Sequence, residues 1–372
     1  MSRAPRLCIL RSRIEIEQPL REWAERYEAE LPDLSVAPEW SLIAADTAGL
    51  GSSLAVAALY LPDGRLAGAT VFVESTARMC GLSVRVRELP GNRLMAYHHE
   101  LIGGHAAELL RAVADAVETP CDVMLVPSVE RGGATDTATT RYAAARGARW
   151  ERVPGVRSPY LKVTGSWDEY LATRSANFRQ NLKRKRKALA AHGEVTERFY
   201  TQESEVAELL ELIGQVERAS WKVGAGMAIS ASAQERDYYT SLLPWLARKQ
   251  ALSANVLFVG GVAAAYSLCY RWRDRVAQMK TSFDERLSAA TPGLTVNATA
   301  IRQAFESGAV EFDFLGDVMP HKMHWTDQLR LHDNLYVFLP TAKGRLVGLA
   351  KSVFRRLRPH RRVETVGRGG RR

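Results

Sequence analysis

Two stretches of the chain show apolar runs that are interrupted by a turn signal. Residues 54–75, LAVAALYLPDGRLAGATVFVES, place an Asp-Gly pair (63–64) between two such runs. Residues 252–271, LSANVLFVGGVAAAYSLCYR, place a Gly-Gly pair (260–261) in the same position. Both dipeptides are typical of the tight turn of a β-hairpin. We therefore expect two hairpins, one in each half of the chain.

A helix and then a strand are expected after each hairpin. In the first half they cover residues 105–118 and 122–128, and in the second half residues 292–307 and 310–315. The same order of hairpin, helix and strand thus occurs twice. This repeat predicts an α/β (α+β) fold of two similar domains, each a mixed sheet flanked by helices.

The repeat also suggests where the chain divides. A length of 372 residues exceeds that of one ordinary core. We expect a first domain over residues 1–160 and a second over residues 161–340, with the boundary near residues 155–165. Residues 341–372 should form a basic amphipathic helix and a disordered tail.

One helix expected in the second domain is strongly basic. Ser166 and Glu169 form a capping-box pattern that predicts its start, and Gly193 predicts its end. Between them, residues 174–187 hold seven Lys or Arg and no acid. Such a segment either attracts phosphate, on a nucleotide, an RNA or a membrane, or is a solvated helix face.

The C-terminal segment accounts for most of the net charge of +10. Residues 351–372 hold nine Lys or Arg and one Glu, which is +8. Just before and within it, one helical face carries four apolar residues: Leu346, Leu349, Val353 and Leu357. A basic amphipathic helix of this kind lies on anionic membranes, or it packs on the second domain as a terminal helix.

The cysteines and the hydropathy pattern bear on the compartment. The four cysteines are scattered without metal-ligand spacing, which favours reduced thiols. No apolar run reaches membrane-spanning length, and arginines interrupt the apolar patch near Met1. We expect a cytoplasmic protein that can associate peripherally with the inner face of the membrane.

Polar and aromatic side chains crowd the end of the strand in VEFDFLGDVMPHKMHW. They are two carboxylates, an imidazole, an ammonium and an indole: Asp313, Asp317, His321, Lys322 and Trp325. Functional sites of α/β folds gather at the carboxyl ends of strands. A cluster of salt bridges that closes the sheet is the alternative. His321 and His324 lack a third nearby ligand, so no metal site is expected.

A second candidate lies at the start of the helix over residues 292–307. Thr291 can cap it, Pro292 suits its first turn, and Gly293 lets a ligand approach the backbone. The N-terminal end of a helix that follows a strand presents N–H groups to a phosphate. A well-capped structural helix would look the same in sequence.

Five segments together resemble a known family. TPG, DFLGD, HKMHW, the basic helix RSANFRQNLKRKRKAL and the element ASWKVG are similar to motifs of the CelD/BcsL acetyltransferase-like family. This family belongs to the GNAT superfamily and is related to the FemAB peptidyltransferases. The resemblance covers residues 167–325 well and the first half in outline. It implies tandem GNAT-like domains, of which the first is degenerate.

The resemblance implies an N-acyltransferase without a tightly bound cofactor. Acyl-CoA or an acyl-carrier protein would be the co-substrate, and an amino sugar or amino lipid of the cell envelope the acceptor. The implied roles are catalysis for Asp313, Asp317 and His321; substrate binding for Lys322, Trp325, Trp221, Lys222 and Arg179; and donor binding for Thr291, Pro292 and Gly293. The residues before Thr291 depart from the glycine-rich loop of ordinary GNAT enzymes.

Two alternatives stay open from the sequence. One is a FemAB-like transferase that takes its group from an aminoacyl-tRNA bound by the basic helix. The other is a non-catalytic scaffold in polysaccharide or envelope synthesis. Their partners would be tRNA in the first case and a membrane complex in the second.

Overall fold

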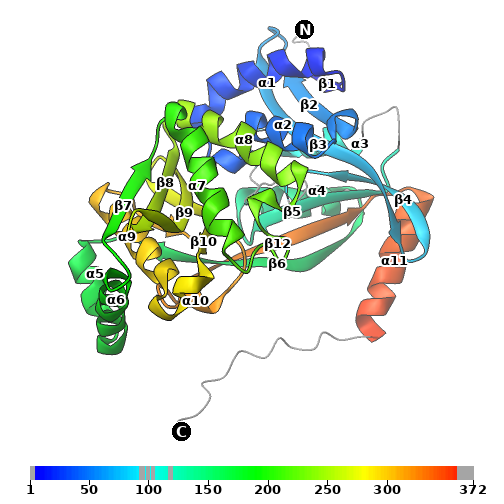
Figure 1. The fold of residues 1–372 in the computed structure, drawn as a ribbon. Coiled ribbons are helices and arrows are strands. Elements are labelled where there is room, and N and C mark those ends of the chain that lie inside the picture. The colour runs from blue at the N-terminus through cyan, green and yellow to red at the C-terminus, as the bar shows by residue number, and fades with distance from the viewer. Residues whose placement is uncertain (1–4, 92–96, 98–100, 102–104, 116–119, 358–372) are drawn as a thin grey trace.

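A computed structural model describes residues 5–91, 97, 101, 105–115 and 120–357. Twelve strands form one continuous sheet in the order β1-β2-β3-β4-β5-β12-β6-β11-β10-β9-β8-β7. Helices cover the sheet on both sides (Figure 1). The fold is therefore mixed α/β, as the sequence predicts.

The strands of the first half begin with the predicted hairpin, whose turn lies between β2 and β3. Strand β5 then pairs in parallel with β4. The six strands are β1 (Arg6–Leu10), β2 (Leu54–Tyr60), β3 (Leu66–Met79), β4 (Leu82–Glu88), β5 (Val123–Glu130) and β6 (Arg149–Lys162).

The second half repeats this arrangement. The predicted hairpin is β8–β9, β10 pairs antiparallel with β9, and β11 pairs in parallel with β10. The six strands are β7 (Val195–Tyr200), β8 (Leu252–Val259), β9 (Val262–Trp272), β10 (Arg275–Phe283), β11 (Glu311–Asp313) and β12 (Leu329–Phe338). The predicted repeat of hairpin, helix and strand is thus confirmed.

The helix that precedes the parallel strand in each half is α3 or α9, close to the predicted ranges. The helices are α1 (Arg13–Tyr27), α2 (Pro38–Thr47), α3 (Ala106–Asp115), α4 (Ala134–Ala145), α5 (Trp167–Thr173), α6 (Ala176–Ala190), α7 (Val206–Arg218), α8 (Ala233–Arg248), α9 (Pro292–Glu306), α10 (Pro320–Met323) and α11 (Ala342–Leu357). Short 3₁₀ turns connect several of them.

The prediction of one basic helix from Ser166 to Gly193 is wrong in one respect. The capping box of Ser166 is present, but the helix breaks at Arg174, whose backbone is extended. Ser175 then caps α6 by accepting a hydrogen bond from the N–H of Phe178. A serine inside a helical pattern can compete as a cap, and here it starts a second helix.

The segment predicted as the domain boundary is a strand rather than a linker. Strand β6 pairs with β12 over its first part and with β11 over residues 160–162. Strand β12 comes from the second half of the sequence, yet it lies between β5 and β6. The two halves therefore share one sheet, and the domain limits at residues 160 and 340 stay a prediction.

Aromatic side chains pack the two halves together. Trp40 of α2 is fully buried and meets Tyr238 and Trp245 of α8 and Tyr270 of β9 edge-on. The Tyr270 hydroxyl donates to the buried carboxylate of Asp33 at 2.9 Å. Burial of such large rings contributes strongly to stability, so this cluster keeps the halves in one orientation.

A buried carboxylate fixes β12 in its position. Asp333 has an exposure of 0%, and Arg131 and Arg152 both donate to it at 2.7 Å. Arg152 also donates to Asp136 of α4 at 2.6 Å. Burial alone would raise the pKa of Asp333, but the hydrogen bonds and charges of the two arginines outweigh it, so the pKa is lowered.

We expect Asp333→Asn to reduce the free energy of unfolding by about 3 kcal/mol at pH 7, because it leaves two guanidinium groups without their carboxylate. The lowered pKa means that this stabilisation is full above about pH 4 and is lost as the pH falls through the folded-state pKa. Denaturant titrations across pH would measure it. The difference from wild type should shrink in acid, and the exposed Asp327→Asn should behave as wild type; equal stability of Asp333→Asn at pH 7 would contradict this role.

Candidate active site

Strands β10 and β11 separate after a short parallel pairing. The two strands pair for three residues only, and the last pair is Ala277 with Asp313. Strand β10 continues to Phe283 through a bulge between residues 278 and 280, whereas β11 ends. Leu315 and Gly316 then take left-handed conformations with φ of 47° and 57°. We call residues 278–283 and residues 314–325, which follow the last pair of these two parallel strands, the wedge.

Asp313 lies at the base of this wedge and is held by other groups. Its side chain is buried, accepts a hydrogen bond from the N–H of Leu315 at 2.7 Å, and accepts another from Arg330 at 2.6 Å. Arg330 also bridges to Glu311 at 2.7 Å. These contacts match the salt-bridge cluster that the sequence left as an alternative, because both carboxylate oxygens already accept strong hydrogen bonds.

Lys322 closes the turn that follows β11. Its ammonium is buried and donates to the carbonyl oxygens of Leu315 at 2.5 Å and Asp317 at 3.2 Å. Burial lowers the pKa of Lys322, while the carboxylates of Asp313 and Asp317 partly oppose this shift. The side chain therefore stabilises the turn, and in this structure it does not extend toward solvent.

Asp317 and His321 are the exposed members of the predicted set. The Asp317 carboxylate accepts hydrogen bonds from the backbone N–H groups of Arg157 and Val318. Partial burial and the nearby charges of Lys322 and Lys222, with His324, lower the pKa of His321 below its ordinary 6.5. Its imidazole is thus neutral at pH 7 and can accept a proton.

Trp325 packs the turn against α5 and α6. It is 1% exposed, and its ring meets Phe178 of α6 edge-on at 5.0 Å. Its carbonyl oxygen accepts hydrogen bonds from the Tyr170 hydroxyl at 2.7 Å and from Arg174 at 3.2 Å. The indole, for which the resemblance implies substrate binding, is therefore buried in the packing between the turn and these helices.

Arg179, another predicted binding residue, contacts the end of α5. Its guanidinium donates to the carbonyl oxygens of Ala172 at 3.0 Å and Arg174 at 2.6 Å. Carbonyl groups at a helix C-terminus lack intrahelical partners and favour a cation. The side chain therefore joins α5 to α6.

The predicted Trp221–Lys222 element lies in a buried polar cluster. Trp221 is 41% exposed, but Lys222 is only 6% exposed, and its Nζ lies 4.0 Å from Oε1 of Glu217. Glu217 is fully buried and also accepts a hydrogen bond of 2.6 Å from the hydroxyl of Tyr266. The Lys222 ammonium lies 5.8 Å from the centre of the Tyr266 ring. We call Glu217, Lys222 and Tyr266 the lysine cluster.

Burial and a second cation change the chemistry of this lysine. Burial, together with the charge of Lys280 on β10, lowers the pKa of Lys222 to about 8, although Glu217 and Glu235 partly oppose the shift. Lys280 itself donates to Glu235 at 3.1 Å. An ammonium with so little access to water interacts strongly with negative charge that a reaction brings beside it.

Sequence reasoning missed the partners of Lys222. Glu217, Tyr266 and Lys280 lie on three different elements, α7, β9 and β10. Each reads in the sequence as an ordinary polar position of an amphipathic element. Lys222 also acts on the pKa of His321, so the lysine cluster and the turn after β11 lie within electrostatic reach of each other.

The start of α9 partly matches its prediction. Thr291 occupies the position before the helix with φ of 52°, but its side chain makes no cap; the hydroxyl donates to the carbonyl of Ser288 instead. Pro292 is the first helical residue, as predicted. A Cβ atom at Gly293 would lie 3.1 Å from the ring of Phe283, so a side chain there would crowd the end of β10.

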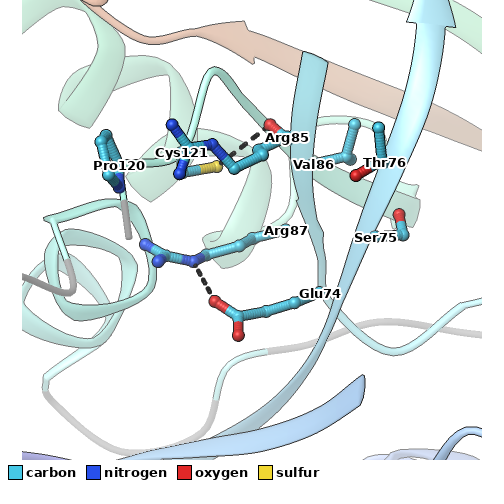
Figure 2. A pocket seen from close by; sticks show the side chains of 8 residues that line it. All are labelled: Glu74, Ser75, Thr76, Arg85, Val86, Arg87, Pro120 and Cys121. Atoms are coloured by element: carbon cyan, nitrogen blue, oxygen red, sulfur yellow. Dashed lines mark hydrogen bonds and ion pairs between the residues drawn. The ribbon is translucent and has the colours of Figure 1, made fainter. Parts of the chain in front are cut away.

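A separate cavity of about 250 Å³ lies in the first half of the chain (Figure 2). Arg87 within it donates to Glu74 at 2.8 Å and to the carbonyl of Val113 at the same distance. Burial raises the pKa of the Cys121 thiol to about 11. Arg87 and Glu74 are paired with each other and the Cys121 thiol is protonated at neutral pH, so none of these three side chains is a ready nucleophile.

A known family model matches part of the second half of the chain. Residues 176–323 match the model of an acetyltransferase (GNAT) domain. The chain contains a GNAT acetyltransferase domain. The lysine cluster, the start of α9 and the wedge up to residue 323 fall within the matched residues, and the protein is an acyltransferase. No sequence among the curated proteins matches the chain.

Solved structures share the fold over nearly the whole chain. FemX has 11% identity, a TM-score of 0.57, and coverage of 89% of this chain and 98% of its own. The C-terminal domain of a putative lysylphosphatidylglycerol synthetase from Agrobacterium fabrum has 10% identity, a TM-score of 0.51, and coverage of 91% and 96%. A conserved protein from Bacteroides thetaiotaomicron has 12% identity, a TM-score of 0.54, and coverage of 86% and 97%. The fold therefore extends beyond the matched GNAT domain into the first half.

The contacts of Asp313 and Asp317 predict that the same substitution destabilises the protein at the first position and leaves its stability nearly unchanged at the second. Asp313→Asn should reduce the free energy of unfolding by about 3 kcal/mol, because it leaves buried Arg330 with one carboxylate fewer. Asp317→Asn, at an exposed position, should change it by less than about 0.5 kcal/mol. Urea denaturation of both variants measures the difference. An Asp313→Asn protein of full stability whose turnover has fallen by orders of magnitude would instead make Asp313 the catalytic base.

Proposed function

We propose that the GNAT domain transfers an acyl group from a thioester to an amine within the wedge. The observation that carries this proposal is the buried Lys222 ammonium, which lies in a water-poor cluster and acts electrostatically on the neutral imidazole of His321. A cation for the developing oxyanion and a neutral proton acceptor are what amine acylation needs.

In the proposed reaction, the amine nitrogen attacks the thioester carbonyl and forms the new C–N bond. The carbonyl oxygen becomes negative, and Lys222 stabilises that charge. His321 accepts the proton that the amine loses. The C–S bond then breaks, the carbonyl re-forms, and the thiolate leaves to be protonated by the imidazolium or by water. Lys222 and His321 would thus each stabilise a charge that arises only during the reaction.

Acyl-CoA or an acyl-carrier protein is the donor that we propose. GNAT domains ordinarily use acyl-CoA, and the matched region includes α9. The Thr291-Pro292-Gly293 start of α9 adjoins the end of β10, and helix N-termini favour phosphate groups. The thioester end of such a donor would then reach the wedge.

An amine of the cell envelope, on an amino sugar or an amino lipid, is the proposed acceptor. One protein that shares the fold, a putative lysylphosphatidylglycerol synthetase, supports the envelope part of this proposal, because its name denotes an aminoacylated lipid. No helix in the described ranges is long and apolar enough to cross a bilayer. We propose a location in the cytoplasm or peripherally at the membrane.

An aminoacyl-tRNA donor is the second candidate, and α6 is the observation that favours it. This helix carries six Lys or Arg and no acid. Lys183 and Lys187 are exposed, and neither contacts a carboxylate of the described chain. Exposed lysines one helical turn apart, such as Lys183 and Lys187, can bind the phosphates of an RNA. Acylation by an aminoacyl ester would use the same wedge and the same lysine cluster.

The two donors are distinguished by direct binding. Thermal unfolding should be followed with acetyl-CoA, long-chain acyl-CoAs, deacylated CoA and a charged tRNA, each at about 100 times its dissociation constant, where a ligand of the native state adds roughly 2.7 kcal/mol. An upward shift with acyl-CoA and none with tRNA supports the first candidate. The reverse result supports the second, and the absence of any shift would argue against both.

Lys222→Met should lower turnover about 100-fold or more, because it removes the cation beside the developing oxyanion. The folded protein should keep most of its stability below pH 8, because the lowered pKa of Lys222 means that its charged form costs folding free energy there. Removal of that cost offsets the loss of the cation beside the buried carboxylate of Glu217. That cost should disappear as the pH rises towards the ordinary lysine pKa. Exposed Lys162→Met is the matched control.

Steady-state kinetics and thermal melts would test this separation of activity from stability. The wild-type rate should also fall above about pH 8, where Lys222 loses its proton. Unchanged turnover in Lys222→Met would remove the lysine cluster from the mechanism.

A further inference from the structure

Helix α11 packs on the sheet through its smallest residues. Val347 is fully buried against Phe338 and the valines of β4 and β5. Gly344 and Gly348 leave no room for a side chain: a Cβ atom would lie 2.3 Å from the Leu339 carbonyl oxygen in one case and 3.0 Å from Phe338 in the other. One narrow side of the helix is therefore fixed on the sheet.

The outward side of α11 is apolar. Four large side chains lie there, with exposures of 56% for Leu346, 49% for Leu349, 47% for Val353 and 57% for Phe354. The spacing of Leu346, Leu349 and Val353 places them along one stripe of the helix, and Phe354, seven positions after buried Val347, lies at its edge. A solvent-facing stripe of this size normally marks an interaction site. Figure 1 shows α11 at the edge of the molecule. We call these four residues the α11 stripe.

The charge beside the stripe indicates what covers it. Residues 351–372 hold nine Lys or Arg and one Glu, so most of the net charge of the protein follows directly on the stripe. Lysines on the helix flank it as well: Lys343 donates to the carbonyl of Ser83, and Lys351 lies 3.8 Å from Glu151. The occupant must therefore offer both an apolar phase and negative charge.

We infer that α11 docks the protein on the surface of an anionic lipid bilayer. The four apolar side chains would insert among the acyl chains near the headgroups, and the basic segment would neutralise the lipid phosphates. The helix would lie flat, because its other side stays on the sheet. Two helical turns of apolar contact give reversible binding, which acidic lipid strengthens.

The other occupants fit less well. A second copy of the chain would bring two segments of charge +8 together, and they repel each other. An RNA would satisfy the arginines but would leave the apolar stripe in water. The inference goes beyond acyl transfer, and the binding test below needs no turnover, so it can fail while the proposed function holds.

The test is sedimentation of the full-length protein with vesicles of phosphatidylcholine and phosphatidylglycerol in about a 2:1 ratio, and with vesicles of phosphatidylcholine alone. Wild type should bind the anionic vesicles, and salt should weaken the binding. The double variant Leu346→Gln/Phe354→Gln should bind at least about tenfold more weakly, because two inserted apolar groups are lost. Ile14→Gln is the control, since Ile14 on α1 is 89% exposed and lies outside the stripe.

Equal melting temperatures of the three proteins would show that the substitutions leave the fold intact. Equal binding by wild type and the double variant would overturn the inference, as would equal binding to neutral and anionic vesicles. So would a dimer in analytical ultracentrifugation that the double variant dissociates, because the stripe would then be an interface between copies.

Discussion

Arg330 holds the short strand from which the whole candidate site extends. Three residue pairs to β10 and three to β6 are few hydrogen bonds with which to position β11. Arg330 reaches across from β12 to both Glu311 and Asp313, with its side chain 9% exposed. A buried guanidinium between two carboxylates has one favourable geometry, so it fixes where β11 ends. The turn with Lys322, His321 and Trp325 takes its position from that end.

Strand β12 thus serves both halves of the molecule. Its Asp333 is clamped by arginines of the first half, and its Arg330 clamps the carboxylates of the second. The strand lies between β5 and β6, so the sheet is continuous through the junction. Rigid placement of the wedge follows from this continuity rather than from the GNAT domain alone. The lysine cluster differs from these clamps, because burial of the charged Lys222 lowers the free energy of unfolding. Such a cost is common where a buried charge is used in a reaction.

Local signals in the sequence were sufficient for much of the fold. Asp-Gly and Gly-Gly turns fixed two hairpins, and Pro292 and Ser166 marked helix starts, because each acts on its own few residues. The insertion of β12 had no such signal, since it depends on pairing with residues about two hundred positions away. For the same reason Asp313 could be read as a base, while Arg330 and Glu217 drew no attention. The amphipathic pattern of α11 was visible, but only the structure shows that the apolar stripe faces outward.

A co-crystal structure with a non-hydrolysable thioether analogue of an acyl-CoA tests the central claim most directly. The claim is that donor and acceptor meet in the wedge between β10 and the turn after β11. The analogue should place its sulfur, and the methylene carbon that replaces the thioester carbonyl, between His321 and the ammonium of Lys222, with its phosphates at the start of α9. An analogue bound elsewhere, with its reactive end far from Lys222 and His321, would contradict it.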